Sequence, residues 1–263
     1  EIIMNCITTD NLNISYGSLD IVKNLNLKIP KGKITTIIGA NGCGKSTVLK
    51  TIARILTPKS GEIYINEKNI KEQGAKELAK VMAVLPQSPQ APNGLTVEEL
   101  IAYGRFPHQK GFGKLKKEDK NIIQWALEVT GLIEFRERDI EDLSGGQRQR
   151  AWIAMALAQQ TDILILDEPT TYLDLAHQLE ILNLLKELNE NHGTTIVMVI
   201  HELNNAARFA DYMIGMKSGK IACQGTAYEV MTKENLKELF NIDAEIIEDP
   251  RNKRPVCVTY DML

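Results

Sequence analysis

The sequence predicts an α/β fold with a mostly parallel core sheet, an N-terminal group of antiparallel strands and a helical insert. Four short apolar runs rich in Ile and Val do not alternate with polar residues, which is typical of strands buried on both faces of a parallel sheet. Helical patterns lie between these runs, and strands that alternate with helices indicate the α/β class. The core strands are expected at Thr35–Gly39, Val81–Leu85, Ile163–Leu166 and Thr195–Ile200.

The N-terminal part of the chain has a different pattern. Its short segments are half polar and are separated by turn residues such as Pro30-Lys31-Gly32. Segments of this kind are typical of antiparallel strands. We therefore expect strands beside the core at Leu12–Tyr16, Leu25–Ile29 and Glu62–Asn66.

Three helices are predicted from apolar residues at helical spacing. Gly131 and Gly193 lie just beyond two of them, where a glycine commonly ends a helix. The predicted helices are Ser46–Leu56, Asn121–Val129 and Ala176–Asn191.

A helical insert is expected after the second core run. Pro86, Pro89 and Pro92 stiffen a connector, and Thr96–Glu99 then begins a helix with the sequence of a capping box. We therefore expect one domain over residues 1–263, with a helical subdomain inserted into the core. The expected parts are residues 1–89 and 161–240 for the core, 90–160 for the helical subdomain and 241–263 for a C-terminal extension.

The composition argues against several classes of protein. The 263 residues carry 31 Lys and Arg against 34 Asp and Glu, for a net charge of −3. A dedicated nucleic-acid binder normally has a basic excess, so no nucleic-acid partner is expected. No apolar run approaches the roughly 18 residues that a membrane-spanning helix needs.

The cysteines and the N-terminal residues indicate the cellular compartment of the protein. The four cysteines form no C-x-x-C pair, so neither a zinc site nor a disulfide framework is expected. Residues Glu1–Asn5 lack the basic region of a secretory signal, and a first residue other than Met suggests trimming. We therefore expect a soluble protein of a reducing compartment. The cysteines are Cys6, Cys43, Cys223 and Cys257.

A phosphate-binding loop is the strongest motif in the sequence. Residues Gly39–Thr47 fit the pattern G-x-x-x-x-G-K-[ST], after a predicted strand and before a predicted helix. Its glycines let successive backbone N–H groups curl around phosphate oxygens, Lys45 supplies a positive charge, and the Ser46 hydroxyl suits Mg²⁺. This pattern predicts binding of a nucleoside triphosphate; the alternative is an ordinary glycine turn. The candidate binding residues are Gly39, Asn41, Gly42, Cys43, Gly44, Lys45, Ser46 and Thr47.

Two acidic residues end the third apolar run. The strand Ile163–Leu166 is followed directly by Asp167 and Glu168. At the carboxyl end of a buried strand, Asp167 is suited to hold Mg²⁺ through water and Glu168 to take a proton from attacking water. The alternative is a strand that merely ends in solvated acids, and the phosphate loop in the same chain disfavours it.

A second anion site is predicted at the start of another helix. Ser144 and Gln147 have the spacing of a capping box, and Arg148–Gln159 continues as a helix. Two glycines in the first turn leave backbone N–H groups unshielded at the positive end of the helix dipole. The alternative is a well-capped helix without a ligand. The candidate residues are Ser144, Gly145, Gly146 and Gln147.

Together these motifs resemble those of the nucleotide-binding subunits of ATP-binding-cassette (ABC) transporters, and the resemblance covers nearly the whole chain. Gly39–Thr47 resembles the Walker A motif and Ile163–Glu168 the Walker B motif, and Leu143–Gln147 matches the signature sequence without a departure. The resemblance implies the ABC-ATPase version of the P-loop NTPase fold, with ATP and Mg²⁺ as its ligands.

Four further positions match motifs of that family. Gln87 resembles the Q-loop glutamine, His201 the switch histidine that contacts the γ-phosphate, and Tyr16 the aromatic residue that stacks on adenine. Thr171–Asp174 stands at the place of the D-loop, where Ser-Ala-Leu-Asp is commoner, and it retains Asp174. For His201 and Tyr16 the alternative is ordinary packing. The resemblance implies catalytic roles for Glu168, His201 and Gln87, and magnesium binding by Ser46, Gln87 and Asp167.

The resemblance also implies a mechanism with two copies of the chain. In this family the ATP-bound state is a head-to-tail dimer, in which ATP on one Walker A motif meets the signature of the other copy. Closure of the dimer drives the membrane subunits, and hydrolysis with Glu168 as the base releases it. The residues that would act in trans are Ser144, Gly145, Gly146, Gln147 and Asp174.

Two longer stretches indicate the kind of transporter. Ala102–Gln109 and Thr170–Leu182 resemble the ATPases of iron(III)-siderophore importers and of their cobalamin and haem relatives. The family implies two permease subunits, contacted here through the Gln87–Gln109 region, and an external substrate-binding protein. The chain is then expected at the cytoplasmic face of a bacterial or archaeal membrane.

Two alternatives stay open at this point. The first is the same role for another cargo, such as haem, cobalamin, manganese or zinc, because an ATPase subunit of this kind does not itself contact the cargo. The second, of a different class, is a soluble ATPase of Fe–S cluster assembly.

A lysine cluster follows the helical segment around residue 105. Because Glu118 and Asp119 are interleaved with the lysines, this segment is expected to be a solvated loop. The lysines are Lys110, Lys114, Lys116, Lys117 and Lys120.

Overall fold

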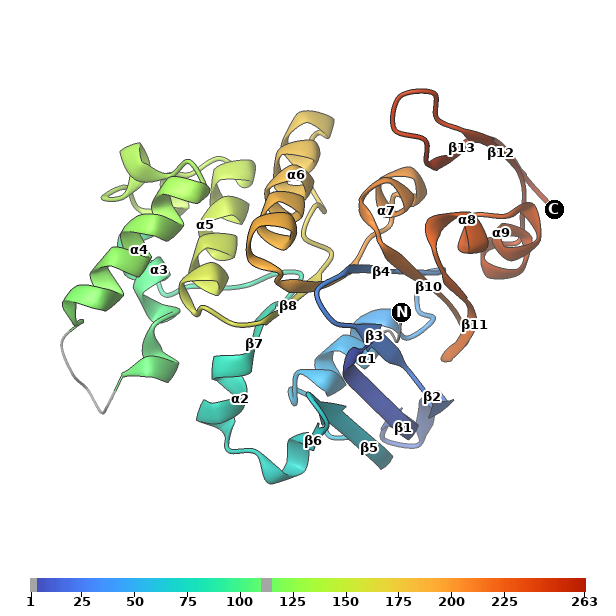
Figure 1. Cartoon of the computed structure of the whole chain (residues 1–263), viewed down its shortest axis with the longest axis horizontal. Coiled ribbons are helices and arrows are strands. Elements are labelled where there is room, and N and C mark those ends of the chain that lie inside the picture. Colours follow the sequence, from blue (N-terminus) through green and yellow to red (C-terminus); the bar gives the residue numbers. More distant parts are fainter. Residues whose placement is uncertain (1–3, 110–114) are drawn as a thin grey trace. The chain divides into compact units, whose positions relative to one another are not determined.

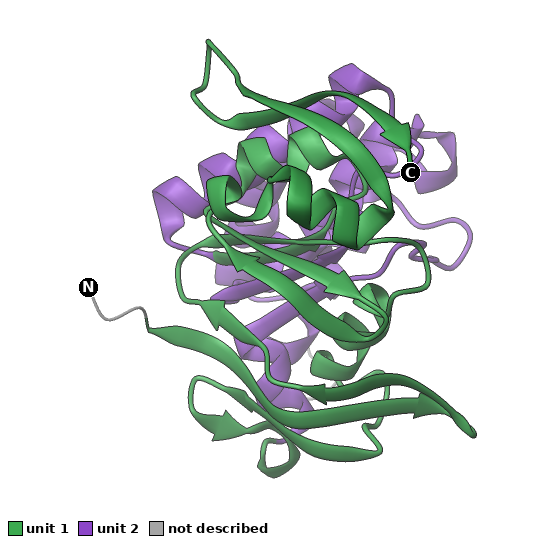
Figure 2. Ribbon diagram, turned by 90° about the vertical axis from the view of Figure 1, so that its right-hand side faces the viewer, with its two compact units in different colours: residues 1–73, 195–263 green, residues 74–194 purple. Residues whose placement is uncertain are grey.

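The computed structural model describes residues 4–109 and 115–263, so Lys110 and Lys114 lie outside the described residues. The chain divides into two compact units, residues 1–73 with 195–263 and residues 74–194 (Figure 2). Each unit is described below by itself. The sequence predicts different boundaries, with a helical subdomain over residues 90–160. This division stays a prediction.

The first unit begins with an antiparallel sheet around the long strand β1, as expected (Figure 1). In β1, Ile7, Leu12 and Ile14 are almost completely buried and Cys6 and Thr9 are also buried. Its exposed residues are Asp10, Asn11 and Tyr16. The strands lie in the order β2–β1–β5–β6, and β3 also pairs with β1. They are β1 (Asn5–Tyr16), β2 (Leu19–Leu25), β3 (Lys28–Pro30), β5 (Ser60–Ile65) and β6 (Lys68–Asn69).

The single strand predicted at Leu25–Ile29 is wrong, because two strands meet there. β2 ends at Leu25 and β3 begins at Lys28. The side chain of Thr9 bridges the break: its hydroxyl donates to the Leu25 carbonyl (2.8 Å) and accepts from the Leu27 N–H (2.8 Å). A side chain therefore replaces ladder hydrogen bonds at this point, which an alternation of polar and apolar residues does not reveal.

The same unit holds a group of mainly parallel strands. β4 pairs in parallel with β9 and β10, and β11 pairs with β10 in the antiparallel direction. All residues of β4 and β9 are buried, as the apolar runs predict. The strands are β4 (Ile34–Ile38), β9 (Thr195–Val199), β10 (Tyr212–Lys217) and β11 (Lys220–Gly225).

Helices and a terminal hairpin complete the first unit. A 3₁₀ turn (Ile70–Glu72) follows β6. The C-terminal extension forms a two-stranded antiparallel sheet. The elements are α1 (Lys45–Ile52), α7 (Leu203–Phe209), α8 (Ala227–Val230), α9 (Lys233–Phe240), β12 (Ile242–Glu248) and β13 (Pro255–Met262).

Helix α1 is shorter than the predicted helix, which extends to Leu56. It ends at Ile52, and Arg54 takes a left-handed φ of 58°. The Ile55 N–H then donates to the Lys50 carbonyl (2.9 Å), which closes the last turn of the helix. The apolar residues beyond this point therefore do not continue the helix.

The second unit combines two parallel strands with helices. β7 pairs in parallel with β8, and the helical insert expected from the sequence contains α3, α4 and α5. Its elements are α2 (Ala75–Val81), β7 (Met82–Leu85), α3 (Val97–Tyr103), α4 (Lys117–Val129), α5 (Gly145–Ala158), β8 (Ile163–Asp167), α6 (Leu175–His192) and 3₁₀ turns at Phe106–His108, Ile133–Phe135 and Ile140–Asp142.

The helix ends of this unit agree closely with the predicted caps. Thr96 and Glu99 form the predicted capping box, and so do Ser144 and Gln147. Gly193 follows α6 with a left-handed φ of 66°, as a C-terminal glycine should. Among residues 4–109 and 115–263, no helix combines the length and the apolar character that crossing a membrane requires.

The expectation that Asp119 is solvated is wrong. Asp119 lies in the first turn of α4, and its side chain is 8% exposed. Its Oδ1 accepts from Arg105 Nε (2.9 Å), and Arg105 Nη1 donates to the Ala158 carbonyl (2.7 Å). Burial by itself raises the pKa of the Asp119 carboxyl. The hydrogen bonds from Arg105 and from the Lys116 backbone outweigh it, however, and hold that pKa below its usual value.

We expect Asp119→Asn to lower the free energy of unfolding by about 3–5 kcal/mol at pH 7, because it leaves the Arg105 charge buried without its counterion. Since the pKa of Asp119 is lowered by folding, the pair contributes fully above the usual carboxyl pKa of about 4. Its contribution is lost as the pH falls through the lowered value, so the cost of the variant should shrink in acid.

Urea denaturation of the wild type and the variant at several pH values measures this difference. Asp162→Asn removes an exposed carboxylate of the same unit and is the control, with an expected change below about 0.5 kcal/mol. A cost for Asp119→Asn that is below about 1 kcal/mol at pH 7, or that stays constant in acid, would contradict the prediction.

Candidate active site

The predicted phosphate loop has the strand–loop–helix context that the motif requires. It runs from the end of β4 at Ile38 to the start of α1 at Lys45. Gly39, Gly42 and Gly44 have φ values of 150°, 76° and 106°. A Cβ at Gly39 would lie 2.2 Å from the backbone oxygen of Met216. The loop therefore needs glycine both for its backbone angles and for its close packing.

Lys45 is the charged group at the centre of this loop. Only 5% of the residue is exposed. Its Nζ donates to the carbonyls of Gly39 (2.8 Å) and Ala40 (3.0 Å) and lies 3.8 Å from Cys43 Sγ. These contacts hold a positive charge against the turn whose backbone would surround a phosphate.

His201 lies at the same sheet edge as the phosphate loop. In the parallel pair of β4 and β9, Ile37 is opposite Val199. Gly39 and His201 each lie two residues beyond this pair, just after the ends of β4 and β9. The carboxyl ends of neighbouring parallel strands meet at one edge, and open α/β sheets bind ligands there. The structure therefore brings the exposed His201 and the start of the loop together within the first unit.

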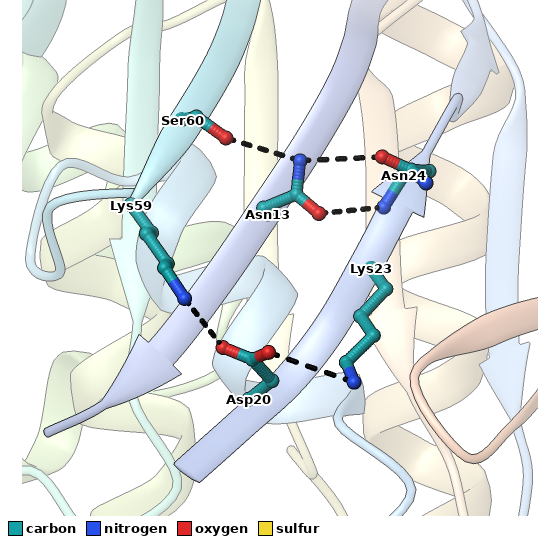
Figure 3. Close-up of polar contacts among 6 residues, drawn as sticks. All are labelled: Asn13, Asp20, Lys23, Asn24, Lys59 and Ser60. Carbon is teal, nitrogen blue, oxygen red and sulfur yellow. Dashed lines mark hydrogen bonds and ion pairs between the residues drawn. The ribbon is translucent and has the colours of Figure 1, made fainter. Parts of the chain in front are cut away.

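Tyr16 lies at the end of β1 and is 49% exposed. Two groups of polar contacts join the neighbouring strands (Figure 3). In the first, Asn13 donates to Ser60 (3.1 Å) and accepts from the Asn24 N–H (3.0 Å). In the second, Asp20 lies between the ammonium groups of Lys59 (2.9 Å) and Lys23 (3.5 Å). The hydrogen bond from Lys59 lowers the pKa of Asp20.

The acidic residues predicted at the end of β8 occupy a comparable edge in the second unit. Asp167 is the last residue of β8 and is 4% exposed. In the parallel pair of β7 and β8, Leu85 is opposite Leu166. Gln87 and Glu168 therefore emerge side by side, two residues beyond this pair.

Glu168 is held by two side chains. Its Oε2 accepts hydrogen bonds from Gln87 Nε2 and from Thr171 Oγ1 (3.0 Å for the second). Its backbone has a left-handed φ of 55°, which is uncommon for a residue with a side chain and typical of functional sites. The structure thus brings together Gln87 and Glu168 and adds Thr171, which the sequence analysis did not single out as a partner of Glu168.

The capping box of the predicted second anion site forms at the start of α5, and binding of an anion there stays a prediction. Ser144 Oγ accepts from the Gln147 N–H (3.3 Å), and Gln147 Oε1 accepts from the Ser144 N–H (3.0 Å). Both glycines lie in the first turn, where backbone N–H groups lack partners within the helix. The site therefore offers backbone donors at the positive end of a helix of 14 residues.

His177, which the sequence analysis did not identify, connects Asp174 with the start of α5. Asp174 caps α6, and its Oδ1 accepts from the backbone N–H and from the Nδ1 of His177 (2.9 and 2.8 Å). A Cβ at Gly146 would lie 2.5 Å from His177 Cδ2. The spacing of three residues between Asp174 and His177 is typical of a helix cap and does not by itself indicate contact with Gly146.

The donor groups at the end of β8 fit a magnesium ion held mainly by phosphate and water. Within the described part of the chain, no group of three or more His, Cys, Asp or Glu side chains gathers as a metal site. Mg²⁺ commonly takes only one or two carboxylates and completes its shell with substrate phosphates and water. The buried carboxylate of Asp167 is a hard oxygen donor of this kind.

Comparison with known proteins gives the family. The family model described as ABC transporter matches residues 22–171. The chain is 62% identical over 260 residues to the iron(3+)-hydroxamate import ATP-binding protein FhuC of Bacillus subtilis (strain 168), covering 99% of this chain and 97% of that protein. It is 49% identical over 252 residues to the petrobactin import ATP-binding protein FpuD of Bacillus anthracis, covering 96% and 92%.

A solved structure agrees with this assignment. The dimeric structure of MJ0796, a bacterial ABC transporter cassette, is 32% identical, with a TM-score of 0.75 over 84% of this chain and 98% of that chain. The same cassette bound to ADP and Pi in a post-hydrolysis state gives a TM-score of 0.73. The chain described here is therefore an ABC ATPase with the P-loop NTPase fold and belongs to the ABC transporter family.

Proposed function

We propose that this chain is the ATP-hydrolysing subunit of an importer of iron(III)-siderophore complexes. The observation that carries the proposal is the 62% identity over 99% of the chain to an iron(3+)-hydroxamate import ATP-binding protein. The 49% identity to a petrobactin import ATP-binding protein supports the same class of cargo. In this proposal the phosphate loop binds ATP, and the Glu168 carboxylate is the base for its hydrolysis.

The residues of each unit have separate roles in this proposal. In the first unit, the loop N–H groups and Lys45 bind the phosphates, Tyr16 stacks on adenine, and His201 contacts the γ-phosphate. In the second unit, Glu168 accepts the proton of the attacking water and Gln87 orients it. Ser46, Gln87 and Asp167 would hold Mg²⁺, which when bound neutralises charge on the transferred phosphoryl group.

We further propose that two copies act as a head-to-tail dimer when ATP is bound. The start of α5 offers a second set of phosphate donors, and in the proposed dimer they contact ATP held by the other copy. The related cassette MJ0796 has been solved as a dimer, which supports this arrangement. The residues proposed to act in trans are Ser144, Gly145, Gly146, Gln147 and Asp174.

The permease is proposed to contact the Gln87–Gln109 region. Phe106 is 56% exposed and packs against Tyr103, with ring centroids 4.9 Å apart and the rings tilted by 35°. The two rings line a hollow of about 280 Å³ together with the apolar residues Leu95, Ala102 and Leu115 and the polar residues Glu99 and Gln109. Arg105, the residue before Phe106, is buried and forms the ion pair with Asp119. We propose that an apolar side chain from a cytoplasmic segment of the permease enters this hollow, a contact that corresponds to a position of the chain at the cytoplasmic face of the membrane.

Phe106→Ala is expected to reduce transport of the iron-siderophore complex at least about tenfold, because truncation of an aromatic hot-spot residue at an interface costs about 2 kcal/mol or more. ATP hydrolysis by the chain alone should stay within about twofold of the wild type, since Phe106 lies outside the proposed nucleotide site. Uptake of radioactive iron-siderophore by cells that carry the variant, together with ATPase assays on the purified chain, measures both quantities.

Tyr260→Ala is the matched control, because Tyr260 is another exposed aromatic residue (63%) and lies on β13. It should leave both quantities unchanged. Full transport by Phe106→Ala would show that the permease docks elsewhere.

The proposed function itself is tested by isolating the tagged chain from detergent-solubilised membranes of its own host. We expect a polytopic membrane protein in equal amount, and loss of iron-siderophore uptake in a deletion strain. Loss of haem, cobalamin or metal-ion uptake instead would change the cargo and keep the role. Capture of soluble partners alone would refute the transport role and favour an ATPase of Fe–S cluster assembly.

A further inference from the structure

His177 joins two segments that are proposed to contact the same nucleotide in trans. We propose that His177 is a positioning residue, which holds Gly146 of the signature at a fixed distance from Asp174 and thereby sets the affinity of the ATP-driven dimer. This inference rests on the proposed head-to-tail dimer. It gives a role to a histidine that none of the motifs assigns.

The first contact is with the signature backbone. A Cβ at Gly146 would lie 2.5 Å from Cδ2, 2.9 Å from Cγ and 3.2 Å from Nε2 of His177. The imidazole therefore occupies the space that any larger side chain at this position would need. By contrast, a Cβ at Gly145 would meet only Leu173 Cδ2, at an ordinary distance of 3.9 Å.

The second contact fixes the orientation of the ring. Asp174 Oδ1 accepts from His177 Nδ1 (2.8 Å) as well as from the His177 backbone N–H (2.9 Å). The backbone hydrogen bond, followed by the bond from the imidazole, lowers the pKa of Asp174, so its carboxylate is ionised at neutral pH. An ionised carboxylate can only accept, so Nδ1 carries the proton and the ring edge that bears Cδ2 and Nε2 faces Gly146.

The third observation is that the ring lies at the surface of its unit and is only partly covered. The His177 side chain is 38% exposed and that of Asp174 is 66% exposed. The neighbouring Tyr172 is 91% exposed with a left-handed φ of 66°, so this turn lies at the surface. A partly exposed ring that contacts a glycine on one side and a carboxylate on the other can transmit position between α5 and the turn before α6.

The test uses Glu168→Gln as the parent, because slow hydrolysis should preserve its ATP-bound dimer. His177→Ala removes both contacts, and His177→Asn keeps a planar group with an N–H donor for Asp174. His192→Ala is the control, since His192 is the other histidine of α6 and lies at its opposite end. Sedimentation measures the dimer dissociation constant in ATP. Fluorescent ATP at low protein concentration measures nucleotide affinity of the monomer.

We expect His177→Ala to weaken the ATP-driven dimer by at least about tenfold, the usual effect of losing a hydrogen bond to a charged group. Nucleotide affinity of the monomer should stay within about twofold, because the phosphate loop lies in the other unit. His177→Asn should recover most of the lost dimer affinity, and His192→Ala should equal the parent.

Each other outcome has a distinct meaning. If the parent forms no dimer in ATP, the head-to-tail arrangement is refuted, and the positioning role that rests on it is refuted with it. A normal dimer with His177→Ala overturns the positioning role. A parallel loss of monomer affinity and thermal stability would make His177 a structural residue, and His177→Asn as weak as His177→Ala would exclude the contact with Asp174 as the cause.

Discussion

Glu168→Gln is expected to slow ATP hydrolysis by about 10²–10³-fold and to leave ATP binding intact, because it removes the proposed proton acceptor and little else. Gln87 and Thr171 both donate to Oε2 of Glu168. An amide oxygen in that place can accept both bonds, so the side chain keeps its position while losing its basicity. With hydrolysis blocked, the ATP-bound state should accumulate as a dimer.

Steady-state phosphate release and gel filtration with light scattering in ATP measure these two effects. Glu187→Gln makes the same chemical change on an exposed position of α6 and should behave as the wild type. Hydrolysis at an unchanged rate would exclude Glu168 as the base. A variant that stays monomeric in ATP would contradict the proposed dimer.

Lys45→Ala is expected to weaken ATP binding at least about 100-fold, which corresponds to about 2.7 kcal/mol. A single ammonium beside two phosphates makes charge-assisted hydrogen bonds that no water replaces in a buried loop. Lys45 is 5% exposed and is held by the Gly39 and Ala40 carbonyls, so its charge is already in place before a phosphate arrives. Preorganisation of this kind strengthens binding because little order remains to be imposed.

Equilibrium titration with a fluorescent ATP analogue measures the affinity. Lys50→Ala is the matched control, since Lys50 lies in the last turn of the same helix and its loss changes the net charge equally. We expect the control to bind ATP within about twofold of the wild type. Equal affinities of the wild type and Lys45→Ala would refute the assignment of Gly39–Thr47 as the nucleotide loop.

Local chemistry made much of this fold predictable. The runs of buried residues in β4, β8 and β9 lie where continuous apolar sequence predicts core strands, because a strand covered on both faces has no solvated side. The caps at Thr96 and Ser144 were also predictable, since a capping box depends only on residues three positions apart. The predicted strand at Leu25–Ile29 failed because the hydroxyl of Thr9, distant in sequence, divides it.

The motifs likewise identified the candidate site without identifying its contacts. The pattern of Gly39–Thr47 is enough to predict a phosphate loop, since only glycines permit those backbone angles. No sequence pattern indicated that Asp119 forms a buried ion pair with Arg105, because an acidic residue in a lysine-rich segment is expected to be exposed to solvent. Its partner becomes apparent only when α4 packs beside the turn after α3.

The sequence by itself therefore determined the class of the fold, the phosphate loop and the order of the catalytic motifs, because these depend on residue type and short spacing. The tertiary structure decided which side chains meet: Thr171 and Gln87 on Glu168, His177 between Asp174 and Gly146, and Arg105 on Asp119. The physical reason is that strand register and helix packing set these distances, and neither is encoded within a single short segment.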